Sequence, residues 1–136
     1  MSRKVTVTAP SFPEAMRNEP FGWQVAKEWQ VLCGDSEHYR IGVYSPKAVS
    51  LAEIAELEKH TCPELFTLLI GAITLVLYTE NGLLTKDLKA GEAIFVDKPH
   101  NGFCPNGPFS GKALVVERDL FSTEYRKVHE WEQENG

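Results

Sequence analysis

The chain of 136 residues has no long block of like charge, no long unbroken apolar run and few cysteines. Its 14 basic and 19 acidic residues are dispersed and give a net charge of −5, so the basic stripe that nucleic-acid binding needs is missing. The longest apolar stretch, residues 65–78, is interrupted by Thr67, Gly71 and Thr74 and is shorter than the roughly 20 residues that span a bilayer. We therefore expect neither a nucleic-acid partner nor a membrane-spanning segment.

The three cysteines Cys33, Cys62 and Cys104 are odd in number and widely spaced, which favours reduced thiols over a disulfide framework. The N-terminal residues carry two positive charges with no apolar segment behind them, so a signal peptide is not indicated. We expect a cytoplasmic protein. A length of 136 residues is typical of one domain. We expect an arm and first strand over 1–37, a barrel over 38–118 and a C-terminal helix over 119–136.

Short segments rich in β-branched and aromatic residues follow one another through the middle of the chain. A strong hairpin signal stands at Asn81-Gly82, and Gly71 divides an apolar run into two buried strands joined at a bend. Strands at a spacing of about ten residues point to an all-β sandwich or small barrel. The predicted strands cover 28–32, 38–44, 64–78 in two parts, 83–88, 93–96 and 112–116.

Three further segments differ from this strand pattern. Residues 9–21 contain three prolines, which predicts an irregular arm that wraps a compact body. A capping box at residues 50–53, followed by apolar residues at threefold spacing, predicts a short helix over 51–59. Helical spacing of apolar residues in a polar segment predicts a second helix over 122–134, packed on the outside of the barrel.

Glu58, His60 and Glu64 stand just before the apolar run, and His100 follows a second glycine-led strand. The fourfold spacing of His60 and Glu64 would suit one face of a helix, but Pro63 lacks an N–H and costs roughly 3 kcal/mol in a helix interior. In an extended chain, residues 58, 60 and 64 share parity and project to one side. These groups can meet His100 only if the chain folds back on itself.

The pattern Glu58-x-His60-x3-Glu64-x6-Gly71 resembles the first conserved motif of the cupin superfamily, in which His-x-His is followed by Glu and then Gly at this spacing. Glu58 stands where that family usually has its first histidine. The resemblance implies an all-β, cupin-like barrel of the jelly-roll or double-stranded β-helix type. The arm precedes this barrel and the C-terminal helix follows it.

Residues 91–100 resemble the second cupin motif, with a spacing two residues shorter, and end on Pro99-His100. By this resemblance His60, Glu64 and His100 are ligands of one divalent metal ion, and Glu58 is the fourth ligand. Two imidazoles and a carboxylate suit Fe, Mn, Ni or Zn and leave positions open for substrate or water.

The resemblance implies a metal-binding protein, and the first hypothesis is an enzyme of isomerase, lyase or oxygenase type acting on a small polar metabolite. Glu58 or Glu64, whichever is not bound to the metal, would move a proton. The alternative is a non-catalytic small-molecule binding or sensing domain, which the carboxylate at position 58 favours. A third hypothesis is an interaction module that forms homodimers through exposed strand edges and the N-terminal arm.

Plainer interpretations stay open for each of these residues. Glu58 would be a solvated residue on the predicted helix, and His60 a partner of the helix C-terminus. Glu64 would lie on the surface at the start of its strand, although burying it without a partner would be costly. His100, between Pro99 and Asn101, would be a turn residue.

Other residues also carry two interpretations. Cys62 and Cys104 each lie near a histidine, which suggests zinc, but buried inert thiols are the plainer alternative. Arg40 and Arg118 would clamp a carboxylate or phosphate, or would be solvated charges. The three tryptophans are expected to be packing residues.

Overall fold

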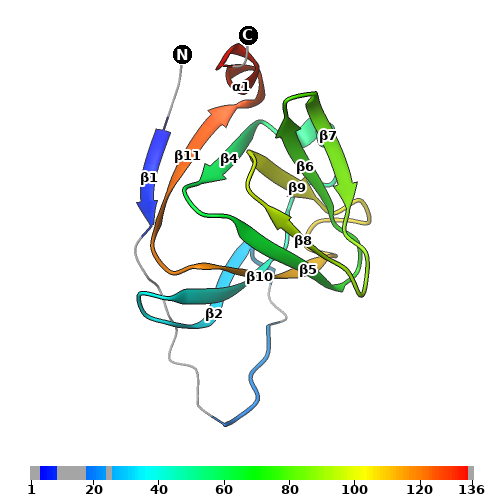
Figure 1. Ribbon diagram of the computed structural model, residues 1–136. Coiled ribbons are helices and arrows are strands. Elements are labelled where there is room, and N and C mark those ends of the chain that lie inside the picture. The colour runs from blue at the N-terminus through cyan, green and yellow to red at the C-terminus, as the bar shows by residue number, and fades with distance from the viewer. Residues whose placement is uncertain (1–3, 9–17, 24–25, 135–136) are drawn as a thin grey trace.

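The computed structural model describes residues 4–8, 18–23 and 26–134, and these form two facing antiparallel sheets (Figure 1). The larger sheet has the strand order β1-β11-β4-β9-β6-β7 and the smaller has the order β2-β3-β10-β5-β8. The first sheet comprises β1 (Lys4–Thr8), β11 (Phe121–Lys127), β4 (Glu56–His60), β9 (His100–Phe103), β6 (Thr74–Thr79) and β7 (Gly82–Asp87). The second comprises β2 (Trp29–Asp35), β3 (Tyr39–Tyr44), β10 (Lys112–Arg118), β5 (Glu64–Ile70) and β8 (Ala93–Val96).

The all-β class predicted from the sequence is confirmed, and so are several of its details. The apolar run divides at Gly71 into β5 and β6, and β6 pairs with β7 across the predicted hairpin, with Thr79 opposite Gly82. Gly71 has a positive φ of 68°, a conformation that suits glycine. The bend therefore carries the chain from the smaller sheet to the larger one.

The predicted helix over 51–59 is wrong beyond its first turn. Only Leu51–Glu53 forms a short 3-10 helix, and Glu56–His60 is strand β4. This strand pairs with β11 on one side and with β9 on the other, and its residue Leu57 is fully buried. Ladder hydrogen bonds and burial in the sheet thus outweigh the local helical preference.

The predicted helix over 122–134 is wrong in its first half. Residues Phe121–Lys127 form β11, which lies between β1 and β4, and the helix α1 covers only Val128–Glu134. Burial alternates at the start of β11, where Phe121 and Thr123 are buried, as a strand requires. In α1, Trp131 is buried against Leu57 on the outer side of the larger sheet, as the sequence predicts for a packing residue.

Two strands were missed by the sequence patterns, β1 and β9. The turn interpretation of His100 is wrong, because this residue opens β9 and pairs opposite Glu58. Of the predicted arm over 9–21, residues 9–17 lie outside the described part of the chain, and residues 18–21 contain neither strand nor helix.

The main apolar core lies between the two sheets. It is built from buried side chains of β5, β6, β8 and β10 and of the segments next to β6 and β9, with Trp29 and Tyr44 packed against it. One member, Phe66, stands edge-on to the ring of His100, with 5.8 Å between ring centroids. This core therefore supports one side of the region where the predicted metal ligands meet. Its buried members are Phe66, Ile73, Leu75, Leu77, Val96, Cys104, Ala113 and Val115.

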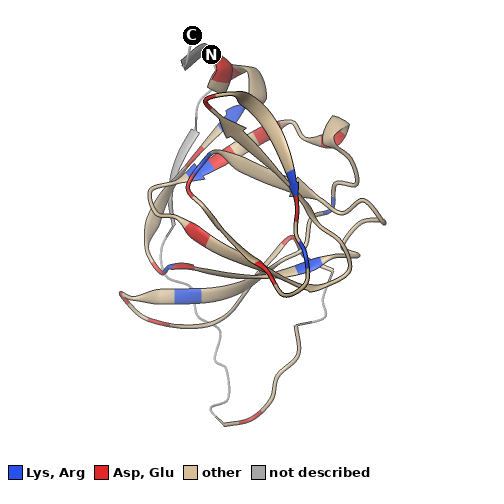
Figure 2. Ribbon diagram, turned by 45° about the vertical axis from the view of Figure 1, so that its right-hand side comes forward, with Lys and Arg blue, Asp and Glu red and all other residues tan. Residues whose placement is uncertain are grey.

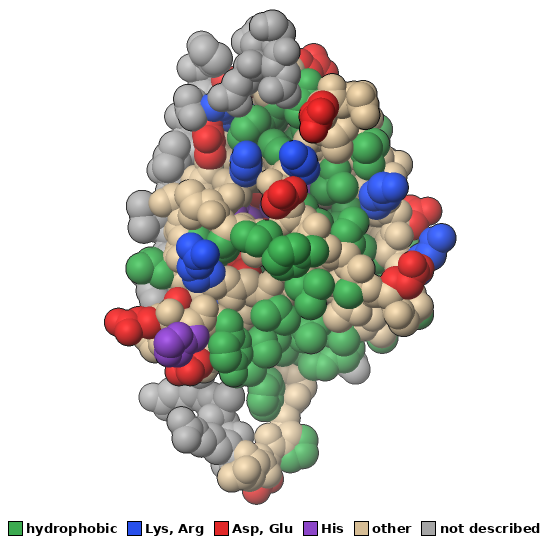
Figure 3. Space-filling model, viewed as in Figure 1, with side chains coloured by type: hydrophobic (Ala, Val, Ile, Leu, Met, Phe, Trp, Pro, Cys, Tyr) green, Lys and Arg blue, Asp and Glu red, His purple; other side chains and the backbone are tan. Residues whose placement is uncertain are grey.

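Acidic and basic residues are interspersed along the chain (Figure 2). Apolar side chains gather over β5 and β8 on the face seen in Figure 3, and Phe95 of β8 is 68% exposed. Because β8 ends its sheet, it is the edge that best suits the expected homodimer, which stays a prediction. No helix among the described residues is long and apolar enough to cross a membrane.

Gly71 provides a test of the bend between β5 and β6. A Cβ at this position would lie 2.3 Å from the carbonyl oxygen of Ser110, in addition to the strain of a positive φ. We expect Gly71→Ala to lower the free energy of unfolding by about 3 kcal/mol in urea titrations. The matched control is Gly91→Ala, which has a φ of +82° but no atom within 4 Å of the added Cβ and should cost only about 1 kcal/mol. Equal losses in the two variants would contradict the steric argument.

Candidate metal centre

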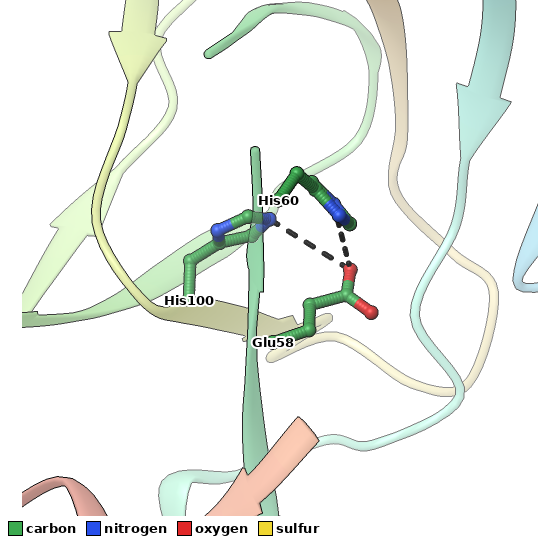
Figure 4. Close-up of side chains that lie close together, drawn as sticks. All are labelled: Glu58, His60 and His100. Atoms are coloured by element: carbon green, nitrogen blue, oxygen red, sulfur yellow. Dashed lines mark ion pairs between the residues drawn. The ribbon is translucent and has the colours of Figure 1, made fainter. Parts of the chain in front are cut away.

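Three strands bring the four predicted site residues together. Glu58 and His60 come from β4, Glu64 from β5 and His100 from β9. Glu58 and His100 are direct cross-strand partners, although 42 positions separate them in the sequence (100 minus 58). The alternation of side chains along β4 sends residues 58 and 60 to the same face, as expected for extended chain. Figure 4 shows Glu58, His60 and His100 pointing toward one another.

The two imidazoles converge on a single oxygen of Glu64. Nε2 of His60 and Nε2 of His100 each lie 2.8 Å from Oε1 of Glu64. Oε1 of Glu58 lies farther away, at 3.6 Å from Nε2 of His60 and 3.7 Å from Nε2 of His100. The surface interpretation of Glu64 is therefore wrong, because its carboxylate is at the centre of the group.

Burial distinguishes the four side chains. The side chains of His60, His100 and Glu64 are 7%, 6% and 5% exposed, whereas that of Glu58 is 33% exposed. Glu58 is thus the member of the group that faces solvent. It lies on a strand and not on a helix, so the interpretation of Glu58 as a solvated helix residue is wrong.

Each of the two histidine rings has a further polar contact through its Nδ1 atom. Nδ1 of His100 lies 2.8 Å from the carbonyl oxygen of Lys98 and must donate to it, because a carbonyl only accepts. In the neutral ring, this leaves the lone pair of Nε2 directed at Glu64. Nδ1 of His60 lies 2.8 Å from Oγ1 of Thr123, and its ring packs edge-on against Phe121 at 4.8 Å. Such contacts fix ring orientation in metal-binding histidines.

Two buried polar atoms of the group lack a hydrogen-bond partner, Oε1 of Glu64 and Nε2 of His100. They are 2.8 Å apart but outside hydrogen-bond geometry. A carboxylate oxygen and an imidazole lone pair repel at this distance unless a cation lies between or beside them. A proton or a metal ion satisfies this requirement. The arrangement therefore fits the nitrogen and oxygen donor set of a divalent metal.

In the metal-free protein, protons on the imidazole rings supply the positive charge that the carboxylate of Glu64 requires. Burial by itself would lower the pKa of His60, but close polar contacts with Glu58 and Glu64 and their negative charges raise that pKa to about 10. Burial opposes the ionisation of Glu64, yet its contacts with His100 and His60 lower the pKa of its carboxyl group far below the ordinary value. The group is thus an ion-pair network in the metal-free protein.

Sequence reasoning missed Glu117, which lies in β10 with its side chain 2% exposed. A ligand oxygen of Glu117 is within 4.8 Å of ligand atoms of His60 and Glu64. Burial and the charge of Glu64 raise the pKa of Glu117, and the ion pair with Arg40 opposes this shift. Its position in the strand was the available signal, because Glu117 follows Ala113 and Val115 at twofold spacing on the buried face.

Arg40 neutralises Glu117 and is itself buried. Its Nε lies 2.8 Å from Oε1 of Glu117, its cross-strand partner, and its side chain is 5% exposed. The guanidinium carbon lies 4.8 Å from the ring centroid of Phe121 and 5.7 Å from that of Trp29. The solvated-charge interpretation is therefore wrong for Arg40, whereas Arg118 is exposed.

The cysteines are not part of the group. Among the described residues, the clusters with metal-binding geometry contain only histidine and glutamate. Sγ of Cys104 accepts from the backbone N–H of Gly111 at 3.4 Å and belongs to the apolar core. This favours buried thiols over a zinc site.

A hollow of about 260 Å³ lies outside this group and is lined by Tyr44, Asn101 and residues of the loops before β4. None of the four site residues lines it. The ring of Tyr44 stands edge-on to Phe66, which in turn stands edge-on to His100. Tyr44 thus lines the hollow on one side and contacts Phe66, the ring that packs against His100, on the other.

No protein-family model matches the sequence, and no curated protein matches it. Solved structures do match the fold. An RmlC-like cupin protein from Desulfovibrio desulfuricans is 16% identical over 77% of this chain and 98% of its own, with a TM-score of 0.51. The iron(II) form of HppE is 17% identical over 80% of this chain and 64% of its own, with a TM-score of 0.56.

The DMSP lyase DddQ from Ruegeria pomeroyi is also similar, with 17% identity over 80% of this chain, 56% of its own and a TM-score of 0.50. The chain thus spans between about half and two thirds of the length of the two enzymes. At these identities the likeness concerns the fold. The protein is a small all-β protein with a cupin fold, as the sequence motifs indicate.

The buried pair of Arg40 and Glu117 provides a test of the interior electrostatics. We expect Arg40→Met to lower the free energy of unfolding by about 3 kcal/mol, because it leaves a buried carboxylate without a partner. Arg118→Met removes the same charge at an exposed neighbouring position and should cost less than about 0.5 kcal/mol. Chemical denaturation of both variants measures the difference. A double variant with methionine at both 40 and 117 should regain most of the loss, and no recovery would count against the ion pair as the cause.

Proposed function

We propose that His60, His100 and Glu64 bind one divalent metal ion and that the protein is a metal-dependent enzyme acting on a small polar metabolite, of isomerase, lyase or oxygenase type. The observation that carries this proposal is the convergence of two imidazole Nε2 atoms on one buried carboxylate oxygen. The lack of a hydrogen-bond partner for Oε1 of Glu64 and Nε2 of His100 supports it. A structural core pair would have satisfied both atoms.

The donor set suits Fe, Mn, Ni or Zn and does not choose among them. When bound, such an ion supplies Lewis-acid polarisation of a substrate oxygen or activation of water or dioxygen. The rings of His60 and His100 are oriented before a metal binds, because Thr123 and the carbonyl of Lys98 contact their Nδ1 atoms.

Glu58 has a different role from Glu64 in this proposal. Glu64 is enclosed and contacts both imidazoles, which suits a permanent ligand. Glu58 is 33% exposed and lies 3.6 Å from Nε2 of His60, so its carboxylate can reach both the site and an incoming molecule. This position suits a fourth ligand or a general base that takes and returns a proton at Oε1.

The two enzymes among the structural neighbours, HppE and a DMSP lyase, support the choice of an enzyme over a simple binding domain. Both have the same fold as this chain, and the cupin fold therefore accommodates more than one chemistry. A non-catalytic binding or sensing domain stays the alternative, because Glu58 departs from the histidine of the cupin motif. Metal content separates the two, since only the enzyme requires the ion.

The first test is loss of metal from histidine variants. Wild-type protein purified without chelator should carry about one equivalent of metal per chain by inductively coupled plasma mass spectrometry. His60→Ala and His100→Ala should each weaken metal binding by more than about tenfold while the fold is kept, because each removes a ligand from the site. His38→Ala is the matched control, since His38 is exposed between β2 and β3. Unchanged metal content in both site variants, with a circular dichroism spectrum like that of the wild type, would contradict the proposal.

Metal uptake should also release protons. In the metal-free protein the pKa of His60 is raised to about 10, so its ring is protonated near neutral pH and must lose a proton before Nε2 can bind a metal. Apparent affinity should therefore rise with pH from about 6 to 9. Calorimetric titrations in two buffers of different ionisation enthalpy measure the protons released. Heats that do not depend on the buffer would show that His60 is not a ligand, and His60→Ala should reduce the buffer dependence.

A further inference from the structure

Glu58 differs from the other three site residues in its exposure to solvent. It is the most exposed of the four site side chains, at 33% against 7% or less for the others. Its Oε1 lies within 3.7 Å of both imidazole Nε2 atoms. The carboxylate of Glu58 is therefore the most solvent-accessible charged group of the site, and it lies beside both imidazole nitrogens.

The charges of the site cancel when a divalent ion is bound. Glu58 and Glu64 supply two negative charges, the ion supplies two positive charges and the neutral imidazoles supply none. Glu117 and Arg40, the next charges inward, neutralise one another at 2.8 Å. The occupied site therefore has no surplus positive charge with which to hold an anion. A histidine in place of Glu58, as in the usual cupin motif, would leave a surplus of one.

The phenol beside Glu58 adds no positive charge to the site. Tyr125 of β11 is the cross-strand partner of Glu58. Burial and the charges of Glu58, Glu56 and Glu64 raise the pKa of Tyr125 to about 12, so its phenol stays neutral and can donate a hydrogen bond. Carboxylates are thus the charged groups that act on the residue beside Glu58.

We propose that this site selects small molecules that place a hydrogen-bond donor or a positive charge, such as a hydroxyl, amine or amidine group, next to the atom that binds the metal. It discriminates against substrates anchored by a carboxylate or phosphate, because Glu58 repels them at the site itself. This inference rests on the proposed function, since it requires a metal bound by His60, His100 and Glu64.

Binding of two simple probes to the cobalt-loaded protein tests the proposal. Azide is an anion and imidazole is neutral, and both bind cobalt with a change in its visible absorption. We expect Glu58→Gln to tighten azide binding about tenfold, because one negative charge beside the ligand is lost. Imidazole binding should change by no more than about twofold. The imidazole titration matters because a newly opened coordination position would tighten both probes equally.

Two further variants complete the experiment. Glu80→Gln removes the same charge from the turn between β6 and β7 and should leave azide binding unchanged. Glu58→His keeps a metal-binding side chain at the position while adding the surplus charge, so it should also tighten azide binding even if Glu58→Gln loses cobalt. Wild-type protein that takes up no cobalt would overturn the proposed function and this inference together. Cobalt uptake with unchanged azide affinity in both position-58 variants, or equal tightening of azide and imidazole, would overturn this inference alone.

Discussion

The contact of two imidazoles with one buried carboxylate is the constraint on which the rest of the site depends. Oε1 of Glu64 can lie 2.8 Å from both Nε2 atoms only if a proton or a metal ion compensates its charge. The strands are arranged to maintain this contact. β5 supplies the carboxylate from the smaller sheet, and β4 and β9 supply the rings from the larger one.

Apolar side chains and charged side chains lie on different sides of the site in the interior of the protein. On one side of the site, Phe66 and the main core exclude water from His100. On another, Arg40 lies near Phe121 and Trp29 and balances Glu117, so a second buried carboxylate can lie near Glu64 without a net charge. Of the four site residues, only Glu58 faces solvent to an appreciable extent, at 33% exposure of its side chain.

The sequence predicted the strands that have an unambiguous local signal. The run with Gly71, the Asn81-Gly82 hairpin and the strand at 93–96 were predicted correctly, because glycine conformation and twofold periodicity are local properties. The segments at 51–59 and 122–127 were predicted as helix, because their apolar spacing suits a helix when neighbours are ignored. Residues 56–60 and 121–127 are strands instead, because β4 and β11 pair with each other. Glu117 was missed because its burial depends on β10 lying between β3 and β5.

The sequence by itself determined the residue types at positions 58, 60, 64 and 100 and the parity that sends 58 and 60 to one face of an extended strand. Those features are local and follow from the spacing of side chains along a chain. Tertiary structure alone decided which of the two carboxylates is enclosed, which one faces solvent and which buried arginine balances the interior. These properties depend on distances between strands that are far apart in the sequence, and no local pattern encodes them.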